Sequence, residues 1–251
     1  MWLILIVSLA GKVAAWAVGW REPMVALGLW FGPDFYVCYQ LLMPNARGLV
    51  PMRRRFRTTE RAVWLTLDDG PDAADTPQIL ALLAKHGAKA TFFVIGENAA
   101  RHPELIRAIV GAGHEVAHHT HTHPLVTFWY AGPARVAREL DAALTVLEAQ
   151  DVRPQRFRPP AGIKSLWLAG ALRRRGLTPV GWTARGREFG AGASELVAAR
   201  VLRGLAPGAI LLLHEGPRVP AGIRVVAIRR VLERLQAEGY RCVIPETAQL
   251  M

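Results

Sequence analysis

The segment "LTLDDGPDAAD", residues 65–75, decides how the rest of the chain is interpreted. An apolar run, typical of a buried strand, ends in the adjacent carboxylates Asp68 and Asp69, and Gly70 and Pro71 follow at once. Asp, Gly and Pro are also ordinary turn residues, because Asp bonds its own backbone and Gly accepts positive φ. A turn therefore explains the segment on its own, unless other polar residues converge on the two carboxylates.

Short β-rich runs alternate with longer segments of helical periodicity from Ala62 onward, the pattern of repeated βα units around a parallel sheet. The runs that predict strands are residues 62–68, 89–95, 114–118, 155–158, 178–182, 208–214 and 240–244. The segments that predict helices are residues 76–87, 103–113, 133–150, 165–176, 193–204 and 222–239. This α/β array fits an open doubly wound sheet or a closed barrel, and periodicity does not choose between them.

Polar residues gather where the predicted strands end. The first strand ends in the two aspartates, and histidines follow the third. The fourth strand ends at Arg158 and the sixth at His214. Because ligands gather outside the carboxyl ends of parallel strands in sheets and barrels alike, we expect these residues to share one site.

The segment "HHTHTH", residues 118–123, holds four imidazoles within six residues. Imidazole is a common ligand of zinc and related divalent metals, so the segment favours a metal site over a solvated loop. One carboxylate and two imidazoles would leave a position open for water, as catalytic metal sites do. If one of the paired aspartates binds the metal, its neighbour is free to remove a proton from that water.

Four motifs resemble those of the NodB-homology polysaccharide deacetylases, carbohydrate esterase family 4. They are "TLDDGP" at 66–71, "HTHTH" at 119–123, "RPPAG" at 158–162 and "LLH" at 212–214, in the family's order. Together they extend over nearly the whole globular part. The resemblance implies a distorted (β/α)7 barrel and metal-dependent removal of N-acetyl groups from amino sugars.

The resemblance also implies the metal ligands, which would be Asp69, His119 and His123. The metal would most often be zinc, with cobalt, nickel and manganese as alternatives. Two histidines of the cluster, His118 and His121, do not match the motif, and we expect them to lie behind the ligands or at the surface.

The catalytic roles follow from the same resemblance. Asp68 would be the general base, oriented by Arg158, and His214 would be the acid that protonates the departing amine. A backbone N–H near Ala161 would help to hold the oxyanion, and Leu212 precedes the acid in its motif.

The chain departs from the family pattern at two positions. Ala161 replaces the usual aromatic residue of the third motif, which would widen the site. Trp182 occurs without the aspartate that usually accompanies it, and Arg185 and Glu188 are the nearest residues that could take the role of that aspartate.

Residues 1–45 are expected to form a hydrophobic membrane anchor. Residues 2–20 have about the length of a membrane span, and Lys12 is their only charge. Cleavage as a secretory signal ranks second, because no positively charged region precedes the apolar run. Residues 23–43 are broken by prolines, a glycine and an aspartate, which suggests a re-entrant or interfacial segment.

Residues 46–61 are expected to be a basic linker, followed by a deacetylase domain over 62–251. The cluster "RRRFR", residues 53–57, favours the cytoplasmic face of the cell (inner) membrane and contact with anionic lipid, although a solvated linker needs no partner. The net charge of +11 would also suit nucleic acid. Basic residues and aromatics do not interleave, so no nucleic-acid partner is expected.

We therefore expect a metal-dependent hydrolase attached to a membrane. Its substrate would be an N-acylated amino sugar in a polysaccharide, a cell-wall glycan or a lipid-linked saccharide. The alternative is a catalytically silent barrel that binds glycan or organises a membrane assembly. Loss of the base, a ligand or the acid would favour that alternative, and all of them are present.

Overall fold

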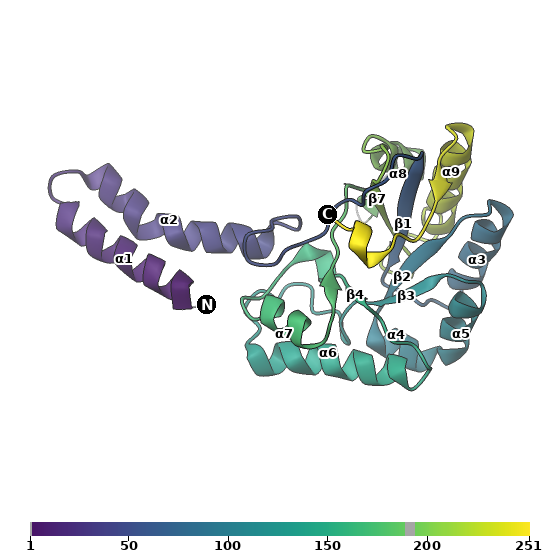
Figure 1. Cartoon of the computed structure of the whole chain (residues 1–251), viewed down its shortest axis with the longest axis horizontal. Coiled ribbons are helices and arrows are strands. Elements are labelled where there is room, and N and C mark those ends of the chain that lie inside the picture. Colours follow the sequence, from purple (N-terminus) through teal and green to yellow (C-terminus); the bar gives the residue numbers. More distant parts are fainter. Residues whose placement is uncertain (1, 189–193) are drawn as a thin grey trace.

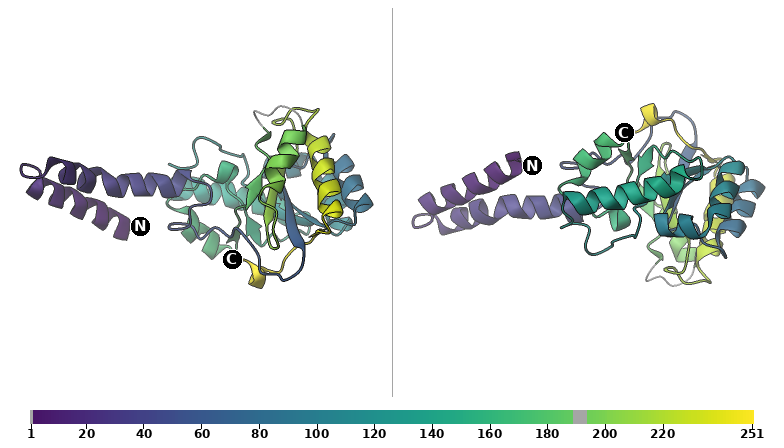
Figure 2. Two further views of the ribbon diagram at one scale, coloured as in Figure 1. Left: turned by 90° about the horizontal axis from the view of Figure 1, so that it is seen from above. Right: turned by 90° about the horizontal axis from the view of Figure 1, so that it is seen from below.

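The computed structural model describes residues 2–188 and 194–251. An α/β body is built on a parallel sheet, and a helical hairpin projects from one side of it (Figure 1). Views from above and below show the helices of the body packed around the sheet (Figure 2). The chain is therefore α/β, as predicted.

Strand β1 (Ala62–Asp68) pairs with three other strands of the sheet, β2, β7 and β8. The sheet order is β5-β4-β3-β2-β1-β7-β6, and β8 also pairs with β1. The bounds of the other strands are β2 (Ala90–Val94), β3 (Glu115–His118), β4 (Arg156–Phe157), β5 (Thr178–Pro179), β6 (Ala184–Arg185), β7 (Ile210–His214) and β8 (Arg241–Cys242). All pairings are parallel, so the carboxyl ends of the strands meet at one edge.

Strand β1 is buried along its whole length, because helices cover the sheet. The helices of the body are α3 (Thr76–Lys85), α4 (Gly96–Arg101), α5 (Pro103–Gly111), α6 (Pro133–Glu148), α7 (Leu168–Arg174), α8 (Ser194–Leu202) and α9 (Arg224–Ala237). A proline stands in the first turn of α3, α5 and α6, where its fixed φ suits the helix and its missing N–H costs nothing. The largest core cluster joins β1, β2 and β7 to α3, α5, α8 and α9.

The sheet is curled and differs in part from the predicted barrel. Strands β5 and β6 are its two ends, and no pairing joins them within the described ranges. The sequence analysis missed β6, which has two residues, and α4, which has six, because neither is long enough to show a period.

The basic segment 46–61 is packed against the body instead of forming a solvated linker. Arg53 forms a parallel bridge with Val180, directly after β5, and Arg55 forms an antiparallel bridge with Ala209, directly before β7. The backbone of this segment therefore links the two sides of the curled sheet, while its arginine side chains remain on the surface.

The N-terminal residues form two antiparallel helices, α1 (Trp2–Val18) and α2 (Pro23–Leu42), that pack against each other (Figure 1). Gly11 allows their close approach, since an added Cβ there would lie 2.5 Å from the carbonyl oxygen of Leu29. Lys12 Nζ pairs with Asp34 Oδ2 at 2.8 Å across the hairpin.

No described helix combines the length and the apolarity needed to cross a membrane. The span predicted over residues 2–20 is therefore not found. α1 has 17 residues, and the longer α2 contains Pro33 and Asp34. The stretch predicted to be re-entrant or interfacial, residues 23–43, is the second helix of the hairpin.

The C-terminal end of α2 is fixed to the body by a buried lysine. Lys164 donates its backbone N–H to the carbonyl oxygen of Leu41 at 2.9 Å, and its Nζ to those of Met43 at 2.5 Å and Pro44 at 3.1 Å. These carbonyls would otherwise lack partners at the helix end. The hairpin is thereby held in a defined position beside the carboxyl-end edge of the sheet.

Candidate active site

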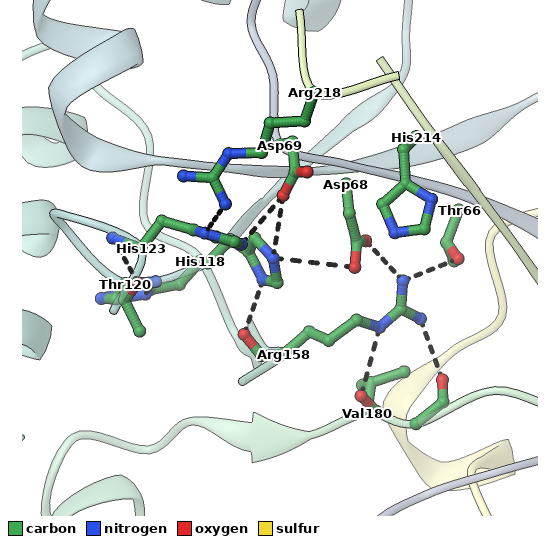
Figure 3. Close-up of polar contacts among 12 residues, drawn as sticks. Thr66, Asp68, Asp69, His118, Thr120, His123, Arg158, Val180, His214 and Arg218 are labelled. Atoms are coloured by element: carbon green, nitrogen blue, oxygen red, sulfur yellow. Dashed lines mark hydrogen bonds and ion pairs between the residues drawn. The ribbon is translucent and has the colours of Figure 1, made fainter. Parts of the chain in front are cut away.

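The predicted polar residues meet in one cavity of about 890 Å³ at the carboxyl ends of the strands. The register of the sheet explains part of this convergence, because Asp68 lies beside His214 across the β1–β7 pair. The sequence-predicted residues that line the cavity are Asp68, Asp69, His119, His123, Ala161, Trp182, Arg185, Leu212 and His214. Figure 3 shows the aspartates, histidines and arginines that surround the centre.

Asp69, His119 and His123 are buried and form the candidate metal site. Figure 3 labels two of them, Asp69 and His123. Asp69 Oδ1 lies 3.4 Å from His119 Nε2 and 3.0 Å from His123 Nε2, and one ligand atom of each residue lies within 4.8 Å of the others. Asp69 Oδ1 is buried without a hydrogen bond of proper geometry. A buried carboxylate oxygen facing two imidazole nitrogens fits a divalent cation.

The charge state of the site also fits a cation. Burial acts to raise the pKa of Asp69, but the contacts with His119 and His123 outweigh it and lower that pKa. Burial, the largest influence, lowers the pKa of His123. The ionised carboxylate and the neutral imidazole are the forms that bind metals.

The two candidate ligand histidines, His119 and His123, each make a second contact through Nδ1. His119 Nδ1 donates to the carbonyl oxygen of Arg158 at 2.7 Å, which directs the Nε2 lone pair toward Asp69. His123 Nδ1 contacts a guanidinium nitrogen of Arg218. Because a guanidinium only donates, ligation through Nε2 of His123 requires the other tautomer, and Arg218 must then turn away.

Asp68 lies beside the ligands and is held by a buried arginine. Arg158 Nη1 donates to Asp68 Oδ1 at 2.6 Å and to Thr66 Oγ1 at 2.8 Å, and Arg158 Nη2 donates to the carbonyl oxygen of Gly181 at 2.9 Å. The guanidinium also lies 4.1 Å from the ring centre of Phe93. With Oδ1 occupied, Asp68 Oδ2 faces the ligand side, 3.8 Å from His119 Nε2.

His214 is oriented by Glu188, which the sequence analysis named only as one of two candidates. The backbone N–H and the Nδ1 of His214 each donate to the carboxylate of Glu188 at 3.1 Å. Burial acts to lower the pKa of His214, but Glu188, Asp68 and Asp69 outweigh it and raise that pKa. The other candidate, Arg185, lies 5.6 Å from the ring centre of Trp182 and lines the cavity.

Backbone strain is concentrated at this site. Six non-glycine residues in the described ranges have a left-handed φ, and five of them belong to the site: Asp69, Thr120, His123, Ala161 and Arg187. Such conformations cost about 1–3 kcal/mol each and persist where the surrounding structure enforces them. Ala161, with φ of 52°, lines the cavity.

The two remaining histidines of the cluster are outside the ligand set. His118 is buried, its Nε2 donates to the carbonyl oxygen of Leu140 at 2.9 Å, and its Nδ1 accepts from the backbone of Thr120. Burial lowers its pKa to about 4. The backbone N–H of His121 donates to Glu139 at 3.0 Å. Both residues therefore hold the ligand loop in place.

Glu215 is a buried carboxyl group that the sequence analysis did not identify. Thr76 Oγ1 donates to its Oε2 at 2.5 Å, and Oε1 has no hydrogen-bond partner among the residues that the structure describes. Burial raises the pKa of Glu215 to about 8. The carboxyl group fills the space that a side chain at Gly70 would need, since an added Cβ would lie 1.8 Å from Oε1.

Comparison with known proteins places this geometry in context. The family described as polysaccharide deacetylase matches residues 56–180. A chitooligosaccharide deacetylase of Bradyrhizobium sp. (strain ANU 289) is 39% identical over 158 residues, which cover 62% of this chain and 71% of that protein.

Solved structures share the fold. A family 4 carbohydrate esterase from Streptomyces lividans, in complex with acetate, has a TM-score of 0.67 and 31% identity, covering 76% of this chain and 96% of that one. A family 4 pseudoenzyme from Bacillus anthracis has a TM-score of 0.67 and 25% identity, covering 75% of this chain and 65% of that one.

Proposed function

This chain belongs to the polysaccharide deacetylase family and is a hydrolase with a divalent metal site, and from that premise we propose that it removes the N-acetyl group from an amino sugar. The observation that carries the proposal is the arrangement at the end of β1: Asp69 joins two imidazoles, while Asp68 stays outside the ligand set. One carboxylate is thus available as a base beside the cation site.

Asp69, His119 and His123 would hold the cation, and we propose zinc because the donors are two imidazoles and one carboxylate. When bound, the cation supplies a Lewis acid that polarises water and the amide carbonyl. The remaining steps depend on side chains and backbone groups of this chain.

Asp68 would accept a proton from the attacking water through Oδ2. Arg158 keeps the other oxygen occupied, so the carboxylate presents one defined face to the reaction. Ala161 lines the same cavity, and its backbone N–H would stabilise the oxyanion.

His214 would protonate the departing nitrogen. Its raised pKa keeps the imidazole charged to higher pH, and the contact of Nδ1 with Glu188 holds the ring in a defined orientation. Without this proton the leaving group would be an amide anion, which is too basic to depart.

The test is acetate release from N-acetylated chitooligosaccharide by metal-loaded protein and by Asp68→Asn. We expect the variant to lose at least about 100-fold in kcat, while Arg107→Gln, on the outer helix α5, keeps wild-type activity. Equal release by wild type and Asp68→Asn would remove Asp68 as the base. No release by either protein would favour the silent barrel, the state known for the related pseudoenzyme.

We also propose that the α1–α2 hairpin attaches the protein to a membrane, on its cytoplasmic face, without crossing it. Trp16 and Trp20 are 80% and 98% exposed, and many other apolar side chains of both helices face outward. Lys12 and Asp34, the only charged residues within the two helices, neutralise each other. The nearby arginines of residues 53–57 support contact with anionic lipid on that face.

A further inference from the structure

Five arginines line the surface between the metal site and the base of the hairpin, and we call them the arginine wall. They are Arg54, Arg185, Arg187, Arg200 and Arg203. Arg185, Arg187 and Arg200 line the active-site cavity and also a second cavity of about 690 Å³. Arg54 and Arg203 line the second cavity as well. This concentration of positive charge is not needed for amide hydrolysis of a neutral sugar.

We propose that the acylated amino sugar is joined through a phosphate to a lipid, and that Arg185, Arg187 and Arg200 bind the phosphate. The lipid would lie along the α1–α2 hairpin. The proposal rests on the deacetylase function above and names the substrate of the same site.

The five arginines of this wall are exposed or half-buried, and they lack carboxylate partners in the part of the chain that the structure describes. Arg156 and Arg158 each pair with a carboxylate, whereas none of the five wall arginines lies within ion-pair distance of a carboxylate in the described ranges. The pKa of Arg185 is lowered, first by burial and then by the charge of Arg187. Like charges held this close favour binding of an anion.

The backbone of the wall is braced from helix α8. Arg200 Nη1 approaches the carbonyl oxygens of Gly186 at 3.5 Å and Arg187 at 3.4 Å. Arg187 has a left-handed backbone with φ of 56°, and no hydrogen bond to its side chain is found in the described chain. Its guanidinium is therefore available for a ligand, and the planar fork of arginine matches two phosphate oxygens.

The arrangement of the wall indicates what is attached to the phosphate. The second cavity is bounded on its far side by Tyr39, Met43 and Pro44, at the end of α2. Lys164 fixes this end of the helix. The order along the surface is thus metal site, arginines and exposed apolar hairpin, which matches an acylated sugar, a phosphate and a lipid chain.

The experiment compares three substrates with metal-loaded full-length protein: neutral N-acetylated chitotetraose, N-acetylglucosamine 1-phosphate, and a polyprenyl phosphate ester of N-acetylglucosamine in phosphatidylcholine vesicles. The measured quantity is kcat/KM from acetate release. We expect the lipid-linked substrate to be preferred over the sugar phosphate, and the sugar phosphate over the neutral glycan.

The variant Arg187→Gln should reduce the ratio of kcat/KM for the phosphate-bearing substrates to that for the neutral glycan by about tenfold. Arg107→Gln removes the same charge from the outer helix α5 and should leave the ratio unchanged. An unchanged ratio in Arg187→Gln would overturn phosphate binding by the wall. Equal use of the free and lipid-linked phosphates would overturn the place of the lipid on the hairpin.

A binding measurement separates this inference from the deacetylase function. Calorimetry with N-acetylglucosamine 1-phosphate and cation-free protein should show binding that weakens in Arg187→Gln, even if no acetate is ever released. Binding of the sugar phosphate no tighter than that of N-acetylglucosamine would contradict the proposed substrate, whatever the catalytic assay shows.

Discussion

Glu188 holds His214 by two hydrogen bonds of 3.1 Å, one to the backbone N–H and one to Nδ1. A single buried carboxylate thus fixes both the strand end and the imidazole. Because the negative charge of Glu188 favours the protonated imidazole, it contributes directly to the raised pKa of His214.

The variant Glu188→Gln should shift the pH dependence of the reaction. His214 must be protonated to act as an acid, so activity falls as pH rises through its pKa. Removal of the Glu188 charge lowers that pKa, and the alkaline limb of the kcat profile should move to lower pH. Glu188→Asp keeps the negative charge, so the alkaline limb of its kcat profile should lie between those of wild type and Glu188→Gln. Identical pH profiles of kcat for wild type and Glu188→Gln would show that Glu188 has no electrostatic role.

Substitution of a proposed ligand should abolish cation binding. His123→Ala leaves two ligands, and we expect the affinity for Zn²⁺ to fall more than about 100-fold, since even residues behind the ligands change affinity 10–100-fold. Calorimetric titration of metal-free protein measures this. The control is His102→Ala, which removes a partly exposed imidazole between α4 and α5, outside the ligand set. Equal affinities for both variants would mean that the ligand set is different.

Gly70 should not tolerate a side chain. The Cβ of Gly70→Ala would lie 1.8 Å from Glu215 Oε1 and 2.4 Å from its Cδ, inside a buried region. We expect a loss of about 1–3 kcal/mol in the free energy of unfolding, as for other overpacked sites. Gly170→Ala, in helix α7 with its nearest contact at 3.5 Å, should be neutral or stabilising. Chemical denaturation compares the two, and a neutral Gly70→Ala would show that Glu215 moves freely.

The carboxyl group of Glu215 should make the free energy of unfolding decrease as pH rises. Its pKa is about 8 in the folded protein against an ordinary value of 4.5. Between these values the folded state keeps a proton that the unfolded state loses, so the stability present at low pH is lost as pH rises toward 8. The slope is at most about 1.4 kcal/mol per pH unit.

The measurement is the free energy of unfolding at several pH values between 5 and about 8. Glu215→Gln removes the titrating group and should flatten the dependence, whereas Glu233→Gln, at an exposed position of α9, should not. Parallel curves for wild type and Glu215→Gln would show that Glu215 is ionised in the folded protein.

The exposed tryptophans of the hairpin should drive vesicle binding. The double variant Trp16→Glu, Trp20→Glu should lower partitioning into anionic phospholipid vesicles more than about tenfold, because burial of each side chain contributes about 1.5–3 kcal/mol. Trp129→Glu, on a loop of the body, is the matched control. Absence of vesicle binding by the wild type, together with a dimer in sedimentation, would mean that the hairpin packs against a second copy.

Much of the body could be predicted from the sequence because the signals are local. The burial of β1 on both faces produces its continuous apolar run, and the predicted bounds 62–68 match the strand. Short elements such as β6 escaped prediction, because two residues carry no period. The span predicted over residues 2–20 is not found among the described helices: composition gives apolarity, but it does not show where a helix ends or that it folds back on a second one.

The sequence by itself determined which residue types were available: two adjacent carboxylates, a histidine cluster, and the order of the four motifs along the chain. Only the tertiary structure decided how they are used. The parallel register brings His214 beside Asp68, and Glu188, not Arg185, reaches the imidazole. The physical reason is that side-chain contacts between residues far apart in the chain depend on how strands and loops align in space, and no local pattern encodes that alignment.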